Sequence, residues 1–181
     1  MFEGWDNFYL IIGPSAGALI GLMFVVVTLT AGRDRDGTEQ GKRLYTSPIV
    51  WHLAVVLLLS GAAVAPAIGP KLFGALTGSV ALLGLLMGIR STIGIARGHL
   101  TGPENNMFDT WWYGIIPAIV YIGLAGAAGA VLSGAPWSAD AVAVALMALL
   151  LVSVHAEWDL VTFLAAIAEP TSKRSESREK N

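Results

Sequence analysis

Five ionisable residues stand within long apolar stretches of this chain, and four of them are its best candidates for chemistry: His52, Arg90, His155 and Asp159. Ionisable side chains are costly inside a membrane, so each is a candidate for a functional role. His155 and Asp159 are four positions apart, which puts both side chains on one face of a helix. Glu157 lies two positions from each of them and is expected to point away from that face.

The depth of each residue follows from a helical rise of about 1.5 Å per residue. Counted in this way, the two histidines lie at one level and Arg90 and Asp159 at another, all near one side of the membrane. We therefore predict that Arg90 pairs with Asp159 and that His52 lies near His155. The resulting polar cluster would link the second, third and fifth apolar stretches.

Three interpretations of this cluster remain open. The first is a buried hydrogen-bonded network that holds the helices together. The second is a small site, open to the cytoplasmic side, for a metal ion, an anion or a lipid headgroup, with His52, His155 and Asp159 as the ligands of any metal. The third is metal-dependent catalysis, although the sequence has no HExxH helix and no P-loop. We assign no catalytic residue and expect no cofactor.

The stretches that hold these residues have the composition and length of transmembrane helices. The chain has 181 residues, of which 55% are hydrophobic and only 13% charged, whereas a soluble domain carries about a quarter charged residues. Runs of about 20 apolar residues cross a bilayer as helices, because every backbone amide must be satisfied within its own segment. The sequence therefore predicts an all-α polytopic membrane protein with a bundle of five transmembrane helices. The predicted spans are Phe8–Ala31, Ser47–Ile68, Leu72–Ala96, Trp112–Ser133 and Ala139–Ala168.

Basic residues indicate the orientation of these spans. They gather in the first loop, after the third span and in the C-terminal segment, and are nearly missing from the second and fourth loops. Because cytoplasmic loops carry the excess of Lys and Arg, we expect the N-terminus outside and the C-terminus in the cytoplasm. Residues 169–181 are rich in Ser, Lys and Glu and are expected to form a disordered cytoplasmic tail.

Glycines recur at helical spacing and predict close helix packing. Gly13, Gly17 and Gly21 follow one face of the first span, and Gly84 and Gly88 follow one face of the third. Small residues let helix backbones approach within a membrane. The glycine faces can meet another helix of this chain, a second copy in a homo-oligomer, or another membrane protein. The lipid bilayer is the expected surrounding, and no nucleic acid is expected as a partner.

The two end helices carry a family resemblance. The first span reads GPSAGALIGLMFVVVTL and the last ends in HAEWDLVTFL. Together they resemble a group of uncharacterised, small bacterial five-span inner-membrane proteins, in which an early helix reads roughly GxxAALxGLxFVxxS and the last helix ends in HxxWDxVTxL. The matching positions are Gly17, Gly21, His155, Trp158, Asp159 and Thr162. Thr28 and Glu157 depart from the group's pattern, and the middle helices match only in hydropathy.

The resemblance implies a multi-pass protein of the bacterial inner membrane, in a group without an established activity. Some members bear a name that suggests modulation of a membrane-anchored ATP-dependent protease, a label without a mechanism. The function that we expect is association, as a non-enzymatic scaffold or as a regulator of a membrane complex. The alternatives are an ion- or small-molecule-binding or transport protein with its polar site at the cytoplasmic end, and a metal-dependent membrane enzyme.

Overall fold

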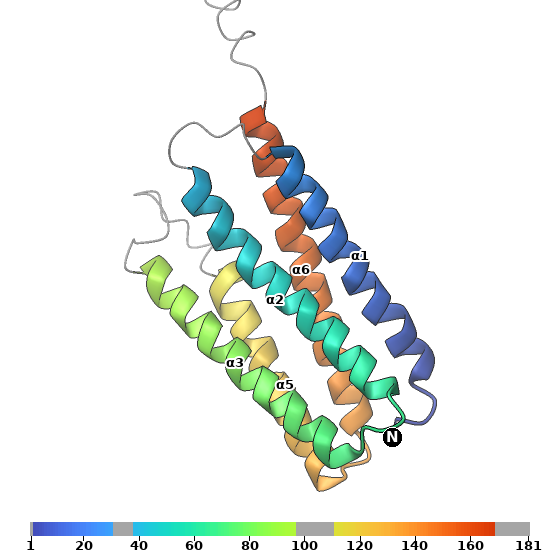
Figure 1. The fold of residues 1–181 in the computed structure, drawn as a ribbon. Coiled ribbons are helices and arrows are strands. Elements are labelled where there is room, and N and C mark those ends of the chain that lie inside the picture. Colours follow the sequence, from blue (N-terminus) through green and yellow to red (C-terminus); the bar gives the residue numbers. More distant parts are fainter. Residues whose placement is uncertain (1, 31–37, 97–110, 169–181) are drawn as a thin grey trace, which may run out of the picture.

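The fold is known from a computed structural model, which describes residues 2–30, 38–96 and 111–168, without the side chains at 29–30, 38–47, 91–96, 113 and 163–168. These residues form helices and no strand (Figure 1). The helices are α1 (Asp6–Thr30), α2 (Thr38–Val64), α3 (Pro70–Ala96), α5 (Ile116–Ser133) and α6 (Ser138–Ala168), with a short π-helix, η1 (Trp111–Ile115), directly before α5. The predicted tail, residues 169–181, lies outside the described residues.

Four of the helices are long and apolar enough to cross a membrane: α1, α3, α5 and α6. Their apolar segments have mean hydropathies between 1.9 and 2.3. In α2, the apolar segment within the described residues is the shorter stretch Pro48–Val64. The prediction of an all-helical membrane protein is therefore confirmed, and the crossing of α2, which would make five spans, stays a prediction.

The helices run alternately up and down the bundle (Figure 1). Each helix packs along the next one in sequence, and α6 closes the ring by packing on α1 as well as on α5. Helices α2 and α6 also contact each other across the ring, so that α2 packs on α1, α3 and α6. By contrast, the described parts of α3 and α6 make no contact with each other.

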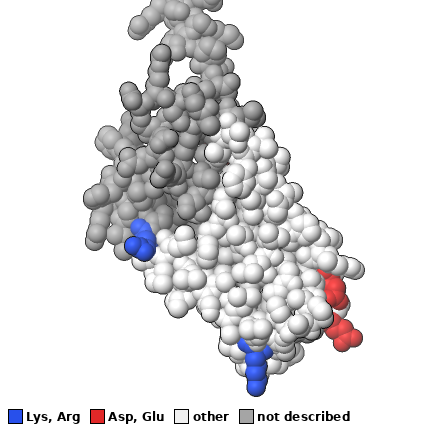
Figure 2. Space-filling model, viewed as in Figure 1, with Lys and Arg blue, Asp and Glu red and all other residues white. Residues whose placement is uncertain are grey.

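Large apolar side chains fill the core of the bundle and also form much of its outer surface. Leu53, Leu59 and Leu146 are fully buried between helices, whereas Leu58 of α2 and Leu82 of α3 are about half exposed. In the view of Figure 2, the described surface is almost entirely uncharged, and the few charged side chains lie near its margins. A surface of this kind is matched to lipid, in which only the ends of a helix need polar side chains.

Two glycines of α3 allow its close approach to α5. A Cβ atom added at Gly84 would overlap Cε1 of Tyr121, and one added at Gly74 would lie 2.8 Å from Cδ2 of Leu132. At Gly88 the nearest atom, the Cβ of Ala118, is at an ordinary distance of 3.9 Å. The backbones of α3 and α5 are therefore held together most tightly at Gly74 and Gly84.

The glycine face of α1 meets a neighbour at only one of its three positions. A Cβ added at Gly13 would lie 3.0 Å from the Cβ of Ser60 on α2. At Gly17 and Gly21 an added Cβ would have no neighbour within 4 Å among the described residues. The glycine face of α1 is therefore open at Gly17 and Gly21, as far as the described residues show.

Replacing Gly84 with Ala tests the contact between α3 and α5. The added methyl group overlaps the ring of Tyr121, which is itself fully buried and cannot swing aside. Overpacking of this kind should lower the free energy of unfolding by about 1–3 kcal/mol, measured as a lower thermal midpoint of the purified protein in mild detergent. The matched control is Gly123→Ala on α5, where the added Cβ has open space. Equal midpoints for the two variants would contradict the close contact.

Candidate functional site

His52 is tied to α5 by a buried hydrogen bond. Its Nδ1 lies 2.7 Å from the hydroxyl oxygen of Tyr121, and the two ring centroids are 5.4 Å apart. Both side chains are buried, with 8% of His52 and none of Tyr121 exposed. Which of the two donates depends on the tautomer of the imidazole. A buried bond between two polar side chains on separate helices satisfies both groups and stabilises the bundle.

Sequence reasoning did not find the partner of His52, although the depth of Tyr121 in its apolar stretch is unusual for a tyrosine. Tyrosines of membrane proteins gather at the two membrane surfaces, whereas Tyr121 lies well inside the apolar stretch Ile116–Ser133. A tyrosine at such a depth needs a partner for its hydroxyl group. Its pairing with the single histidine of α2 was therefore within reach of the sequence.

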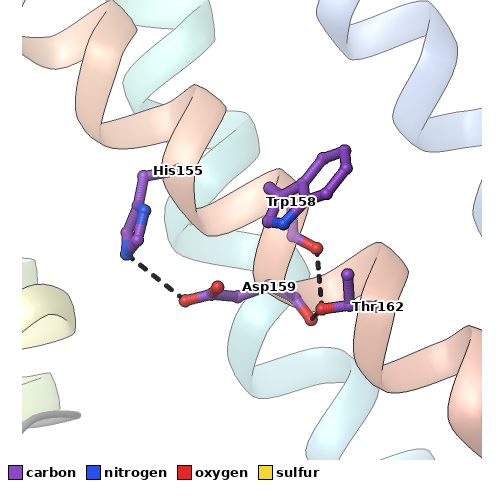
Figure 3. A network of polar contacts seen from close by, with 4 residues as sticks. All are labelled: His155, Trp158, Asp159 and Thr162. Carbon is purple, nitrogen blue, oxygen red and sulfur yellow. Dashed lines mark hydrogen bonds and ion pairs between the residues drawn. The ribbon is translucent and has the colours of Figure 1, made fainter.

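His155 and Asp159 share one face of α6, at the end of the bundle where α1 ends and α2 begins. His155 Nε2 lies 3.5 Å from an oxygen of Asp159 (Figure 3), within reach of an ion pair if the imidazole is protonated, but too long for a good hydrogen bond. Trp112 of η1 covers the imidazole, with ring centroids 3.9 Å apart. Both side chains are part-exposed, at 35% for His155 and 39% for Asp159.

One turn further along α6, Thr162 bonds to its own helix. Its hydroxyl group donates to the backbone carbonyls of Trp158 and Asp159, at 3.0 and 2.9 Å (Figure 3). Local bonds of this kind occupy the threonine hydroxyl within the helix. The side chain of Trp158 is 68% exposed.

The structure does not bring Arg90 to Asp159. The side chain of Arg90 is exposed on α3, and the described parts of α3 and α6 do not contact each other. The two residues can share a depth in the membrane and still be far apart around the bundle axis. Depth alone was the basis of the predicted pair.

The two histidines also have separate surroundings. His52 is bonded to α5, while His155 is covered by Trp112 of η1. Within the described ranges, no three His, Asp or Glu side chains gather closely enough to hold a metal ion. The set of His52, His155 and Asp159 that would ligate a metal is therefore not assembled.

A lateral groove opens between α1 and α6, at the same end of the bundle. Its volume is about 620 Å³, within the range of roughly 300–1,000 Å³ that is typical of ligand sites. Most of its lining is aliphatic. The lining residues are Leu22, Met23, Val26, Leu151, Val154, His155, Glu157, Trp158, Leu160 and Val161.

Glu157 brings a polar group into this apolar groove. Its Oε1 is buried and has no hydrogen-bond partner among the described residues, and the same holds for Nε2 of His155. An unpaired buried carboxyl oxygen costs free energy that a hydrogen-bond donor would recover. Sequence reasoning placed Glu157 away from the face of His155 and Asp159 and did not find the groove, because α1 and α6 lie at opposite ends of the chain.

Comparisons with known protein families, with curated proteins and with solved structures give no match. No family is therefore assigned to the chain. A proposal for its function therefore rests on the geometry of the two polar sites and of the groove.

The His52–Tyr121 bond can be tested with a double-mutant cycle. Tyr121→Phe leaves Nδ1 of His52 buried without its partner, and His52→Leu does the same to the tyrosine hydroxyl. The loss in unfolding free energy for the double variant should be smaller than the sum of the single losses by about 0.5–2 kcal/mol. Reversible unfolding in mixed detergent micelles measures these energies. Strictly additive losses would show that the bond contributes nothing to stability.

Proposed function

We propose that the chain is a non-enzymatic protein of the bacterial inner membrane that acts by association, and that the groove between α1 and α6 is the surface at which another membrane component binds. The observation that carries the proposal is the groove itself, about 620 Å³ in volume and mostly aliphatic, whose lining includes the polar side chains of His155 and Glu157. Apolar grooves with a few polar groups are typical of binding sites. Binding there would regulate or scaffold a membrane complex.

In the proposed topology all five helices cross the bilayer, with the N-terminus outside and the C-terminus in the cytoplasm. The alternation of helix directions supports it, because the three basic segments of the sequence all follow or precede helix ends at one end of the bundle (Figure 1). The apolar stretch Pro48–Val64 is short, but about 17 residues are enough for the thinnest bilayer regions. Its contacts with α1, α3 and α6 also cover part of the surface of α2.

A second candidate surface is the glycine face of α1. Gly17 and Gly21 have open space where a Cβ would stand, so a helix of a second copy or of another membrane protein can approach there closely. This surface favours a homo-oligomer or a scaffold. A channel or carrier built as an oligomer would use the same face.

Single cysteines test the topology, because the chain has none of its own. We expect Glu3→Cys, Ala67→Cys and Pro136→Cys to react with a membrane-impermeant maleimide added to intact cells. Asp36→Cys and Ser175→Cys should react only after the cells are opened. Labelling is read by mass spectrometry of the purified protein. Protection of Ala67→Cys in intact cells, with Glu3→Cys labelled, would contradict the crossing of α2.

A photocrosslinking amino acid tests binding in the groove. Benzoylphenylalanine at position 154 would replace Val154, which lines the groove and is 43% exposed. The matched control replaces Leu83 of α3, which is 49% exposed and lies outside the groove lining. In native membranes, position 154 should capture one defined species and position 83 only a mixture of lipids. Identical adducts at both positions would overturn the proposed binding surface.

A further inference from the structure

The lining of the groove between α1 and α6 indicates what kind of molecule fits it. All ten lining residues are medium-sized or large, and none is Gly, Ala or Ser. A second helix packs closely where small residues let the backbones approach, so a helix does not fit this lining well. A flexible hydrocarbon chain does, since it follows the irregular surface of branched side chains such as Leu22, Val26 and Leu151.

The polar groups of the groove lie near one end of the α6 span. Glu157 is five residues before Thr162, where the apolar segment of α6 ends, so it lies about 7 Å inside that end along the helix. Because the 25-residue segment of α6 is longer than the ~30 Å hydrocarbon core, Glu157 lies only a few Å below the level at which the acyl chain of a phospholipid joins its headgroup. The exposed indole of Trp158 stands beside it, as is common for aromatic residues at the membrane surface.

The charge of the groove selects among headgroups. The two titratable side chains that line the groove are Glu157 and His155. When the carboxyl group of Glu157 is ionised, its oxygens accept hydrogen bonds and donate none. A primary ammonium group supplies up to three N–H donors and a positive charge. A choline headgroup has no N–H donor, and a glycerol headgroup leaves the lipid with a net negative charge next to the carboxylate.

We propose that the groove between α1 and α6 binds one phospholipid with a primary ammonium headgroup, phosphatidylethanolamine, whose acyl chain lies along the aliphatic lining and whose ammonium donates to Glu157. This inference rests on the proposed function and names the component that the groove takes up.

The test reconstitutes the full chain in nanodiscs with equal parts of phosphatidylethanolamine, phosphatidylcholine and phosphatidylglycerol of matched acyl chains. Native mass spectrometry then counts the lipids that stay bound after release from the nanodisc. We expect one tightly held lipid, with phosphatidylethanolamine enriched about tenfold over phosphatidylcholine, a factor that corresponds to about 1.4 kcal/mol. Enrichment of phosphatidylglycerol, or equal retention of all three lipids, would overturn the inference.

Two variants connect this lipid to the groove. Glu157→Gln keeps the shape of the side chain and removes its charge, and should abolish the enrichment. The matched control, Asp6→Asn, removes an exposed carboxylate at the other end of the bundle and should leave it unchanged. Val154→Trp fills the groove without altering its charge and should release the bound lipid. Enrichment that survives both Glu157→Gln and Val154→Trp, in variants with the thermal midpoint of the parent, would place the lipid elsewhere.

The crosslinking experiment at position 154 separates the two proposals. If the nanodiscs show no headgroup preference but position 154 still captures one defined protein, the groove binds a partner helix, and only the lipid inference fails. If position 154 captures nothing beyond the mixture seen at position 83, the binding surface itself is wrong and both proposals fail.

Discussion

The ring of Tyr121 joins three helices of the bundle at one point. From α5 it presses against Gly84 of α3, where even one additional carbon would overlap it, and its hydroxyl group bonds to His52 of α2. In a membrane, helices gain little from burying apolar side chains against one another, because lipid is equally apolar. Close packing and internal hydrogen bonds must supply the specificity instead. Tyr121 provides both, and so fixes how α2, α3 and α5 are arranged.

This arrangement decides what the polar residues of the chain can do. His52 is bonded to Tyr121 of α5 and does not line the groove between α1 and α6. The titratable side chains that line the groove both belong to α6: His155, which Trp112 covers, and Glu157. Under the proposed function, the structural and the binding roles that the sequence assigned to a single cluster belong to two separate sites.

Much of the fold was predictable from the sequence, because hydropathy and glycine spacing act locally. The apolar stretches marked the helices, and the spacing of His155 and Asp159 placed both on one face of α6. Order around the bundle axis was not predictable. It depends on which helices touch, and without that information Arg90 and Asp159 looked like partners, the link between His52 and Tyr121 was missed, and the groove between the first and last helices could not be seen.

The apolar segments of the bundle differ in length, from 18 residues in α5 to 25 in α6, with 23 in α1. At about 1.5 Å per residue, α6 exceeds the ~30 Å hydrocarbon core while α5 falls slightly short of it. Hydrophobic mismatch of this kind is relieved by tilting or by local changes in bilayer thickness, at fractions of a kcal/mol per Å. The two longest segments border the groove, so a thinner bilayer would strain that side of the protein first.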